Sequence, residues 1–545
     1  MDRDPLPRLT CCLLRQEDTM RHHRYTAIGL IHLFVLSSSL WALPSGDMGN
    51  LPLPPAMALE SINEADLREH VEFLASDELG GRYALSRSNR IAARYLASRL
   101  RRDGFRGGAA DGSYFQKIEI EIAQPDPDRT FIEIEGEREQ TRFRLGEAFQ
   151  LLPGEGGIET RGEVVLVPYR LLSSQDATVQ AAVEGKIAVV PIDEETFAHL
   201  TPLEMFRLIM VGWIRRKAAG VLLLVQGHTT AARLPEYLQR RSMMPGRPRL
   251  KEDEEQTSLA PVAWVYDPLI NALFEGLEVA WDTLATETTV RSLGKRVRLH
   301  IATTGSTRVT QNVIGILDGS DPQCKDEYVM FSAHYDHLAS TETRIFNGAD
   351  DDASGTAALL EIAEAFSLGP RPRRSIIIMF HTAEELGLLG SKYFVRHPTV
   401  PLESIVVDLN VDMIGRSRPP GDTDPADREL SDAHTLYLIG SDRLSQELHQ
   451  LSEQTNRDTV GMTLDYRYNR PDHPLRLYYR SDHWNYAKNG IPVIFYFTGL
   501  HRDYHRTTDD VEKLDFEKMT RIARLIFATG WRIANLDHRL RVDHH

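Results

Sequence analysis

Residues 327–337 read EYVMFSAHYDH, and this stretch decides the fold. Its apolar part, 327–333, has the length and composition of a buried strand, and His334 follows it directly. Between this strand and the next, residues 356–367 have the apolar spacing of a helix. Strands that alternate with helices predict an α/β fold, with a mostly parallel mixed sheet and helices on both faces. The same order recurs at 375–380 before Glu384 and Glu385, at 404–411 before Asp412, and at 492–497 before His505.

The candidate functional residues all lie where strands of this sheet are expected to end. Open parallel sheets bind their ligands at the carboxyl ends of the strands, so these side chains are expected to converge. Two imidazoles and three carboxylates, with one carboxylate to spare, suit two divalent metals that share a bridging carboxylate and a water. The residues are His334, Asp351, Glu384, Glu385, Asp412 and His505.

Two of these motifs also have an ordinary structural interpretation. Asp336 can accept a hydrogen bond from the ring nitrogen of His334 that is not on a metal, which would fix the tautomer. Otherwise His334 is a buried histidine with a common hydrogen bond. The run 350–352, three aspartates, can be a solvated turn or can cap the following helix. Adjacent carboxylates repel one another unless a cation lies among them, so a metal-bridging carboxylate is the alternative.

The pair Glu384 and Glu385 can likewise be read in two ways. Both can be first-turn carboxylates that complement a helix dipole. Because adjacent residues point in different directions, one can instead bind a metal while its neighbour reaches the metal-bound water as a general base. Asp412 ends an apolar strand, where an acid is costly unless it is paired.

The motifs around these residues carry a resemblance to a known family. They are AHYDH, NGADDDASG, TAEELGLLGS, NVDMIG, RSDHWNYAKNGIP and YHRTTDD, all within 327–530. In them the chain resembles the secreted di-zinc exopeptidases typified by bacterial leucyl aminopeptidases, with glutamate carboxypeptidase as a more distant relative. HVEFLASDELGGR at 70–82 is similar to that family's N-terminal segment. Residues 155–292 resemble the protease-associated domain often inserted in it, so the resemblance implies a zinc-exopeptidase fold with a smaller, β-rich α/β insert.

The resemblance implies two zinc ions per chain and assigns their ligands. His334 and Asp412 would bind one zinc ion, and Glu385 and His505 would bind the other. Asp351 would bridge both ions through its carboxylate. Its peptide bond to the next residue, Asp352, would be cis.

The resemblance also implies the catalytic groups and the activity. Glu384 would be the general base, Tyr504 a candidate oxyanion donor, and Asp336 the partner of His334. The protein would be an aminopeptidase that acts on peptide substrates. Three alternatives stay open. One is a glutaminyl cyclase, which needs a single zinc. Another is an inactive receptor or binding module on the same fold, although such proteins lose ligands and this chain keeps them all. The third is a carboxypeptidase that reads a terminal carboxylate through Arg470, Arg476 or Arg480.

Length and charge limit the class of protein further. A chain of 545 residues is too long for one core. The formal charge of −15 argues against nucleic acid or an anionic membrane as partner, because both need a basic face. We expect an N-terminal extension with a signal peptide at 1–44, a linker at 45–57, the N-terminal part of the peptidase domain at 58–154, the insert at 155–292 and the catalytic domain at 293–540.

The N-terminal extension has the parts of an export signal. A basic stub at 20–24 precedes an apolar stretch at 25–43 that contains the small residues 37–39. Translation is expected to start at Met20, and the protein is expected to be exported to the periplasm or the medium. The alternative is a membrane anchor formed by 25–43, although His32 and the serine run weaken a spanning helix.

Overall fold

The computed structural model describes residues 52–543, except 136–139, 152–156, 170, 172–176, 193–216, 226–246, 254–259, 278–283 and 285–287. The chain divides into residues 1–49 and a compact unit of residues 50–545, to which all described residues belong. The expected export signal, the alternative anchor and most of the linker therefore lie outside the described residues. Of the described helices, none has the length and hydropathy needed to cross a membrane.

A sheet that contains ten strands of the described residues carries the expected strand ends. Its centre is parallel, and the expected α/β fold with a mixed sheet is confirmed. The parallel strands, in their order across the sheet, are β18 (Val493–Phe497), β15 (Ile405–Val411), β13 (Tyr328–His334) and β14 (Ser375–His381). The outer strands are β17 (Thr463–Asp465) and β16 (Thr435–Ile439) beside β18, then β12 (Thr303–Leu317), β2 (Phe115–Pro125) and β9 (Arg247–Leu250) beside β14, with β1 (Arg106–Gly107) paired to β12.

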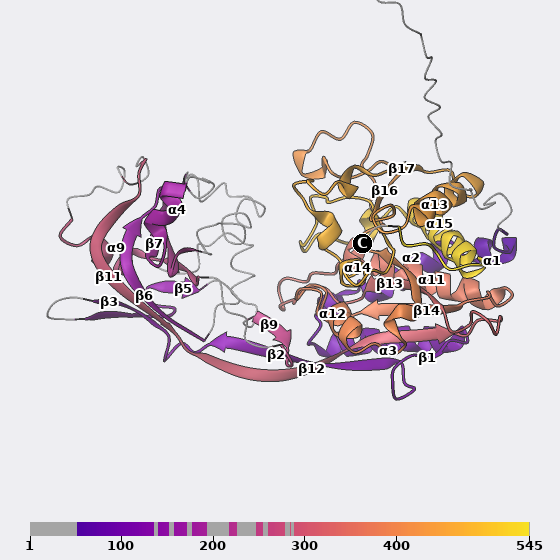
Figure 1. Cartoon of the computed structure of the whole chain (residues 1–545), viewed down its shortest axis with the longest axis horizontal. Helices are drawn as coiled ribbons and strands as arrows, with labels where there is room; N and C mark the ends of the chain where they lie inside the picture. The colour runs from indigo at the N-terminus through magenta and orange to yellow at the C-terminus, as the bar shows by residue number, and fades with distance from the viewer. Residues whose placement is uncertain are drawn as a thin grey trace, which may run out of the picture. The chain divides into compact units, whose positions relative to one another are not determined.

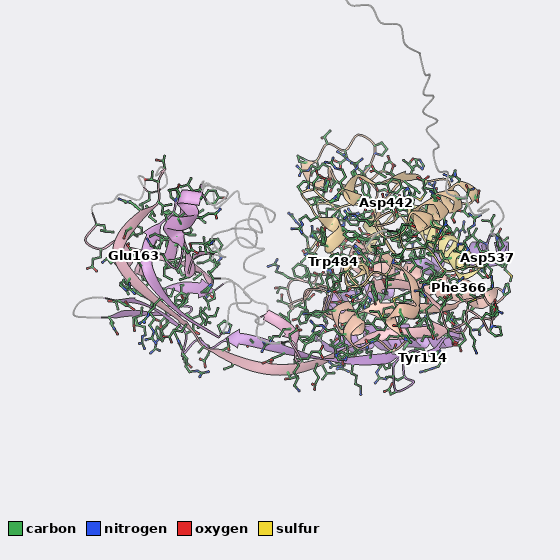
Figure 2. The ribbon with its side chains drawn as sticks, viewed as in Figure 1. Tyr114, Glu163, Phe366, Asp442, Trp484 and Asp537 are labelled. Carbon is green, nitrogen blue, oxygen red and sulfur yellow. The ribbon has the colours of Figure 1, made fainter. Side chains whose placement is uncertain are left out.

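Helices cover both faces of this sheet because successive side chains of a strand point to opposite faces. On β13, Phe331 packs against Phe366 of α11 with ring centroids 5.6 Å apart, and a Cβ at Gly530 of α15 would lie 2.1 Å from its ring. Met330, on the other face, shares a core cluster with Phe394 of α12. Figure 1 shows α15 beside α11 and α13, and Figure 2 labels Phe366 in this layer. The helices of this half are α1 (Ala56–Ser61), α2 (Glu64–Leu74), α3 (Arg87–Arg102), α11 (Gly355–Leu368), α12 (Leu389–Arg396), α13 (Gln446–Asp458), α14 (His483–Ala487) and α15 (Phe516–Ala534).

A second sheet contains eight strands of the described residues and has a core on each face. Val189 and Leu222 belong to the cluster on one face, whereas their neighbours Val190 and Leu223 belong to the cluster on the other. The sheet order is β4–β3–β11–β6–β7–β8–β10–β5. The strands are β3 (Phe131–Glu135), β4 (Thr141–Arg144), β5 (Phe149–Leu151), β6 (Ile158–Leu166), β7 (Ile187–Ile192), β8 (Gly220–Val225), β10 (Val262–Val265) and β11 (Arg291–Ile301), accompanied by α4 (Ala177–Val183) and α9 (Asp267–Phe274).

The second sheet begins earlier in the chain than the boundary at 154/155 implies. Strands β3 to β5, within 131–151, pair with β11 and β10 of the second sheet. A boundary after residue 154 would separate these strands from their hydrogen-bonded partners. The alternating pattern of β3 predicts a strand, but it does not predict which sheet the strand joins.

The chain leaves and re-enters the first sheet on paired strands. β2 and β12 run antiparallel from Phe115 opposite Val313 to Pro125 opposite Thr303. The chain continues from Pro125 into the second sheet, returns to the first sheet for the short strand β9, which pairs with β2, and finally re-enters the first sheet at Thr303. The two ends of the intervening segment therefore lie together, as an insertion requires.

Candidate metal centre

The strand ends bring the expected residues to one pocket. β13 ends at His334, and Asp412 directly follows β15. The glutamate pair follows β14, and His505 lies in the loop after β18. The pocket is lined by His334, Asp351, Glu384, Asp412, Tyr504 and His505, together with Met413, Leu477, Phe495, Phe497, Leu500 and Arg480.

Asp351 presents its two carboxylate oxygens to different imidazoles. Its Oδ1 lies 3.2 Å from His334 Nε2, and its Oδ2 lies 3.1 Å from His505 Nε2. The peptide bond from Asp351 to Asp352 is cis, as expected. One oxygen facing each of two donor groups is the arrangement of a carboxylate that lies between two metals.

Each donor group is completed by a carboxylate from another strand end. Asp412 Oδ1 lies 3.7 Å from His334 Nε2, and Glu385 Oε2 lies 3.1 Å from His505 Nε2. Asp352 also joins the first group, since its ligand atom lies within 4.8 Å of those of His334 and Asp412. The structure thus brings together all five residues expected to bind metal.

His337 is part of the centre, although the sequence analysis gave it no role. The side chain is fully buried, and its Nδ1 lies 2.8 Å from Glu385 Oε1 and 3.7 Å from Asp351 Oδ2. Burial lowers the pKa of His337, which favours the neutral imidazole. Its position three residues after His334, in a stretch that leaves a strand end, was the signal available in the sequence.

Asp336 makes a different contact from the one expected. Nδ1 of His334 donates to the backbone carbonyl of Asp336 at 3.0 Å, whereas the Asp336 carboxylate is 3.9 Å from that nitrogen. The carboxylate instead accepts the backbone N–H of Glu384 at 3.1 Å. Asp336 thus directs Nε2 of His334 toward the carboxylates, and it also fixes the turn that carries Glu384.

Tyr504 lies beside the pocket with its hydroxyl protonated. Its ring stacks on His505 with centroids 3.9 Å apart, and its Oη is 3.5 Å from Nη2 of Arg480. Burial raises the pKa of Tyr504 well above its usual range, so the hydroxyl remains a donor. Of the three arginines considered for a terminal carboxylate, Arg480 lines the pocket, whereas Arg470 is exposed and pairs with Asp472.

The charged groups of the centre perturb one another strongly. Burial opposes the ionisation of Asp351, but His337, His334 and His505 hold its pKa well below the usual range. Burial also opposes protonation of His505, yet Glu385 and Asp351 raise its pKa to about 9. Glu384 differs, because burial raises its pKa well above the usual range, with Glu385 and Asp412 adding to the effect. A glutamate that holds a proton readily suits a group that takes and returns one.

The donor set fits zinc. Imidazole nitrogens combined with carboxylate oxygens are the usual ligands of that ion, whereas calcium and magnesium prefer oxygen alone. Several buried atoms that could bind a metal have no hydrogen-bond partner among the described residues. They are Asp352 Oδ2, Glu385 Oε1 and both ring nitrogens of His337. Such atoms are rare in proteins, and a cation among them would remove the cost of their burial.

Arg82 lies beneath the centre and holds three segments together. The side chain is fully buried and donates to the backbone carbonyls of Leu74, Tyr335, Asn347 and Gly348 at 2.5 to 3.0 Å. Burial lowers its pKa to about 10, so it remains a cation at neutral pH. The segment 70–82 therefore anchors both loops that supply metal-binding residues from 334 to 352.

A buried carboxyl group near the centre gives a pH-dependent prediction. Asp408 of β15 accepts a hydrogen bond from Ser332 Oγ at 2.6 Å, and burial raises its pKa to about 8. Because the pKa of Asp408 is higher in the folded state than in the unfolded state, the contribution of this carboxyl group to stability is present below about pH 4 and is lost as the pH rises through about 8.

In Asp408→Asn this titration is absent. The stability of the variant relative to the natural protein should therefore rise by up to about 1.4 kcal/mol per pH unit between about pH 5 and pH 7. Urea unfolding across that range measures the difference, and a constant value would contradict the prediction.

Comparison with known proteins identifies the domain. Residues 312–530 match the model of Peptidase family M28. The chain carries a family M28 peptidase domain. A "Probable zinc metalloprotease" of Pyrenophora tritici-repentis is 30% identical over 257 residues, which cover 41% of this chain and 51% of the relative. "Leupeptin-inactivating enzyme 1" of Streptomyces exfoliatus is 31% identical over 212 residues, which cover 38% of this chain and 40% of the relative.

The chain spans about half the length of the curated relatives it matches. Among solved structures, an aminopeptidase from Aneurinibacillus sp. strain AM-1 has a TM-score of 0.52 at 16% identity. That match covers 89% of this chain and 97% of the other. It extends the similarity of fold beyond the M28 domain.

Proposed function

We propose that the protein is a zinc-dependent aminopeptidase that binds two zinc ions per chain and removes N-terminal residues from peptides. The observation that carries this proposal is Asp351, which has one carboxylate oxygen toward His334 and the other toward His505. The M28 domain and the zinc metalloproteases among its relatives support the proposal.

The five expected ligands are assigned to two zinc ions according to which side chains lie close together. His334 and Asp412 would hold one ion, Glu385 and His505 the other, and Asp351 both. Two zinc ions held there would lower the pKa of a shared water and polarise the scissile carbonyl. Asp336 would orient His334 through its backbone carbonyl.

Glu384 is the proposed general base. It lines the pocket, yet it belongs to neither group of potential metal donors. Glu384 would take the proton of the attacking water and return it to the leaving amine, so it ends in the state in which it began. The Tyr504 hydroxyl would donate to the oxyanion that develops on the substrate. The acidic side chains favour a substrate with a free α-amino group, which points to an aminopeptidase.

A carboxypeptidase is the second candidate, and Arg480 in the pocket favours it. An inactive binding module is disfavoured because every expected ligand is present. Chromogenic aminoacyl substrates and peptides with a blocked N-terminus distinguish the three. We expect the protein to cleave the chromogenic aminoacyl substrates and not the peptides with a blocked N-terminus. Cleavage of blocked peptides from the C-terminus would favour the second candidate, and cleavage of neither would favour the third.

The zinc content of the protein gives a direct prediction. Protein purified without chelator should contain about two zinc ions per chain, because five ligands with one bridging carboxylate fill two sites and exceed the needs of one. Elemental analysis measures this ratio. Full activity at a ratio near one would contradict the dinuclear assignment.

We also propose export and a modular insert. Residues 1–44 would act as a signal peptide, or 25–43 as a membrane anchor, and N-terminal sequencing of the mature protein distinguishes the two. The strand pairing supports limits near 126 and 302 for the insert, which we propose is a domain of the protease-associated type.

A further inference from the structure

His337 is buried in a way that ordinary hydrogen bonding does not explain. Its side chain is inaccessible to solvent, and within the described residues neither ring nitrogen has a hydrogen-bond partner. Nδ1 nevertheless lies 2.8 Å from Glu385 Oε1, an oxygen that also lacks a hydrogen-bond partner there. The two atoms lie within hydrogen-bond distance, yet they do not form a hydrogen bond.

Two atoms that bind the same metal ion lie close together in this way without forming a hydrogen bond. When a nitrogen and an oxygen each lie about 2.1 Å from one tetrahedral ion, they lie roughly 3.4 Å apart, and both lone pairs point beside the line that joins them. The distances from His337 Nδ1 to Glu385 Oε1 and to Asp351 Oδ2, 2.8 and 3.7 Å, bracket that value. The three residues form a potential metal-binding group whose donor atoms lie within 4.8 Å of one another.

The ring of His337 is also held in place by its surroundings. Gly348 has a φ of +58°, and a Cβ at this position would lie 2.5 Å from Cγ and Cδ2 of the His337 ring. On another side the ring meets His505 edge-on, with centroids 5.7 Å apart. The imidazole therefore has little freedom to leave Glu385, and the missing side chain at Gly348 makes room for it.

We propose that His337 is a sixth protein ligand of the metal centre, on the side of Glu385 and His505. This inference rests on the proposed dinuclear zinc function. With His337 as a ligand, the two zinc sites have different numbers of protein ligands. The side of Glu385 would have four protein donors, Asp351, Glu385, His505 and His337, which is the number typical of tightly held structural zinc sites, and the shared water would be a fifth ligand there. The side of His334 would have three, namely His334, Asp412 and Asp351, because Oδ1 of Asp352 already accepts the backbone N–H groups of Gly355 and Met413. A site with three protein donors keeps a position open for water and substrate.

The inequality predicts the order of zinc binding and its ligands. The first equivalent of zinc should occupy the four-donor side, so its X-ray absorption spectrum should show two imidazoles on that ion. The natural protein suffices for this measurement. A spectrum with one imidazole at one equivalent would overturn the assignment of His337.

A variant tests the same assignment by affinity. In His337→Gln, competition with a chelator should show the tighter zinc bound at least tenfold more weakly, while the weaker zinc changes little. His70→Gln is the matched control, because His70 is also a buried imidazole beside a buried glutamate, 3.3 Å from Glu361, on α2 and α11 rather than in the pocket. Equal zinc affinities in the two variants would overturn the proposal.

The outcomes separate this inference from the proposed function. If the natural protein binds no zinc, the proposed function fails. If it binds two zinc ions but the first has a single imidazole, only the role of His337 fails. Were His337→Gln unable to fold, the absorption spectrum of the natural protein would still decide.

Discussion

Replacing Glu384 with glutamine lowers kcat on the order of 10²–10⁴-fold and leaves the zinc content unchanged. The amide keeps the shape of the side chain but cannot accept the proton of the attacking water. Zinc should remain because Glu384 belongs to neither donor group, whereas its neighbour Glu385 lies 3.1 Å from His505 Nε2. Steady-state kinetics and elemental analysis of the purified variant measure both effects.

Glu385→Gln is the matched control for this experiment. It makes the same chemical change one residue away, and it should lose zinc from the side of His505 together with activity. If Glu384→Gln loses zinc and Glu385→Gln retains it, the roles of the two glutamates are reversed.

Replacing Arg82 with methionine destabilises the fold by about 3–5 kcal/mol. Methionine fills similar space but donates no hydrogen bond, so the carbonyls of Leu74, Tyr335, Asn347 and Gly348 lose a buried donor. The lost cation also leaves the nearby carboxylates, Asp351 among them, without a compensating charge. Urea unfolding monitored by circular dichroism measures the change.

Arg90→Met controls for the loss of an arginine as such. Arg90 is an exposed residue of α3 that donates to the carbonyl of Ser86, so its loss should cost well under about 1 kcal/mol. Equal effects of the two substitutions would show that Arg82 does not hold the loops of the metal centre together.

The sequence predicts the parallel strands and the candidate metal-binding residues because both leave the same signal, whereas the ligand assignment comes from the family resemblance. β13, β14, β15 and β18 are apolar runs, and each of the first three ends at or within a few residues of a side chain that is costly to bury without a partner. His334, Asp412 and the glutamates therefore mark the strand ends and the metal centre at once. The convergence of these strand-end residues follows from the parallel arrangement, whereas Asp351 and His505 are brought to the centre by the loops after β13 and β18.

Other features depend on contacts between distant segments and leave no such signal. The sheet that β3 joins is decided by pairing with β11, more than 150 residues later in the chain. The carboxylate of Asp336 meets the N–H of Glu384 rather than the ring of His334, because the turn after β14 brings that N–H within reach. The role of His337 depends on its distance from Glu385 of another strand end, which periodicity within one segment does not predict.

The pairing of Pro125 with Thr303 bears on how this chain can change over evolution or by design. As Cα partners on adjacent antiparallel strands, these two residues are separated by a single interstrand spacing of about 5 Å. Apart from β9, which adds a strand beside β2, the intervening segment occupies the position of one hairpin loop of the first sheet. Because the entropy of closing a loop grows only slowly with its length, that position can accept a short turn or a complete module with little cost to the strands on either side. The ribbon of β2 and β12 is thus a place where the inserted module can be exchanged while the metal-binding residues keep their register.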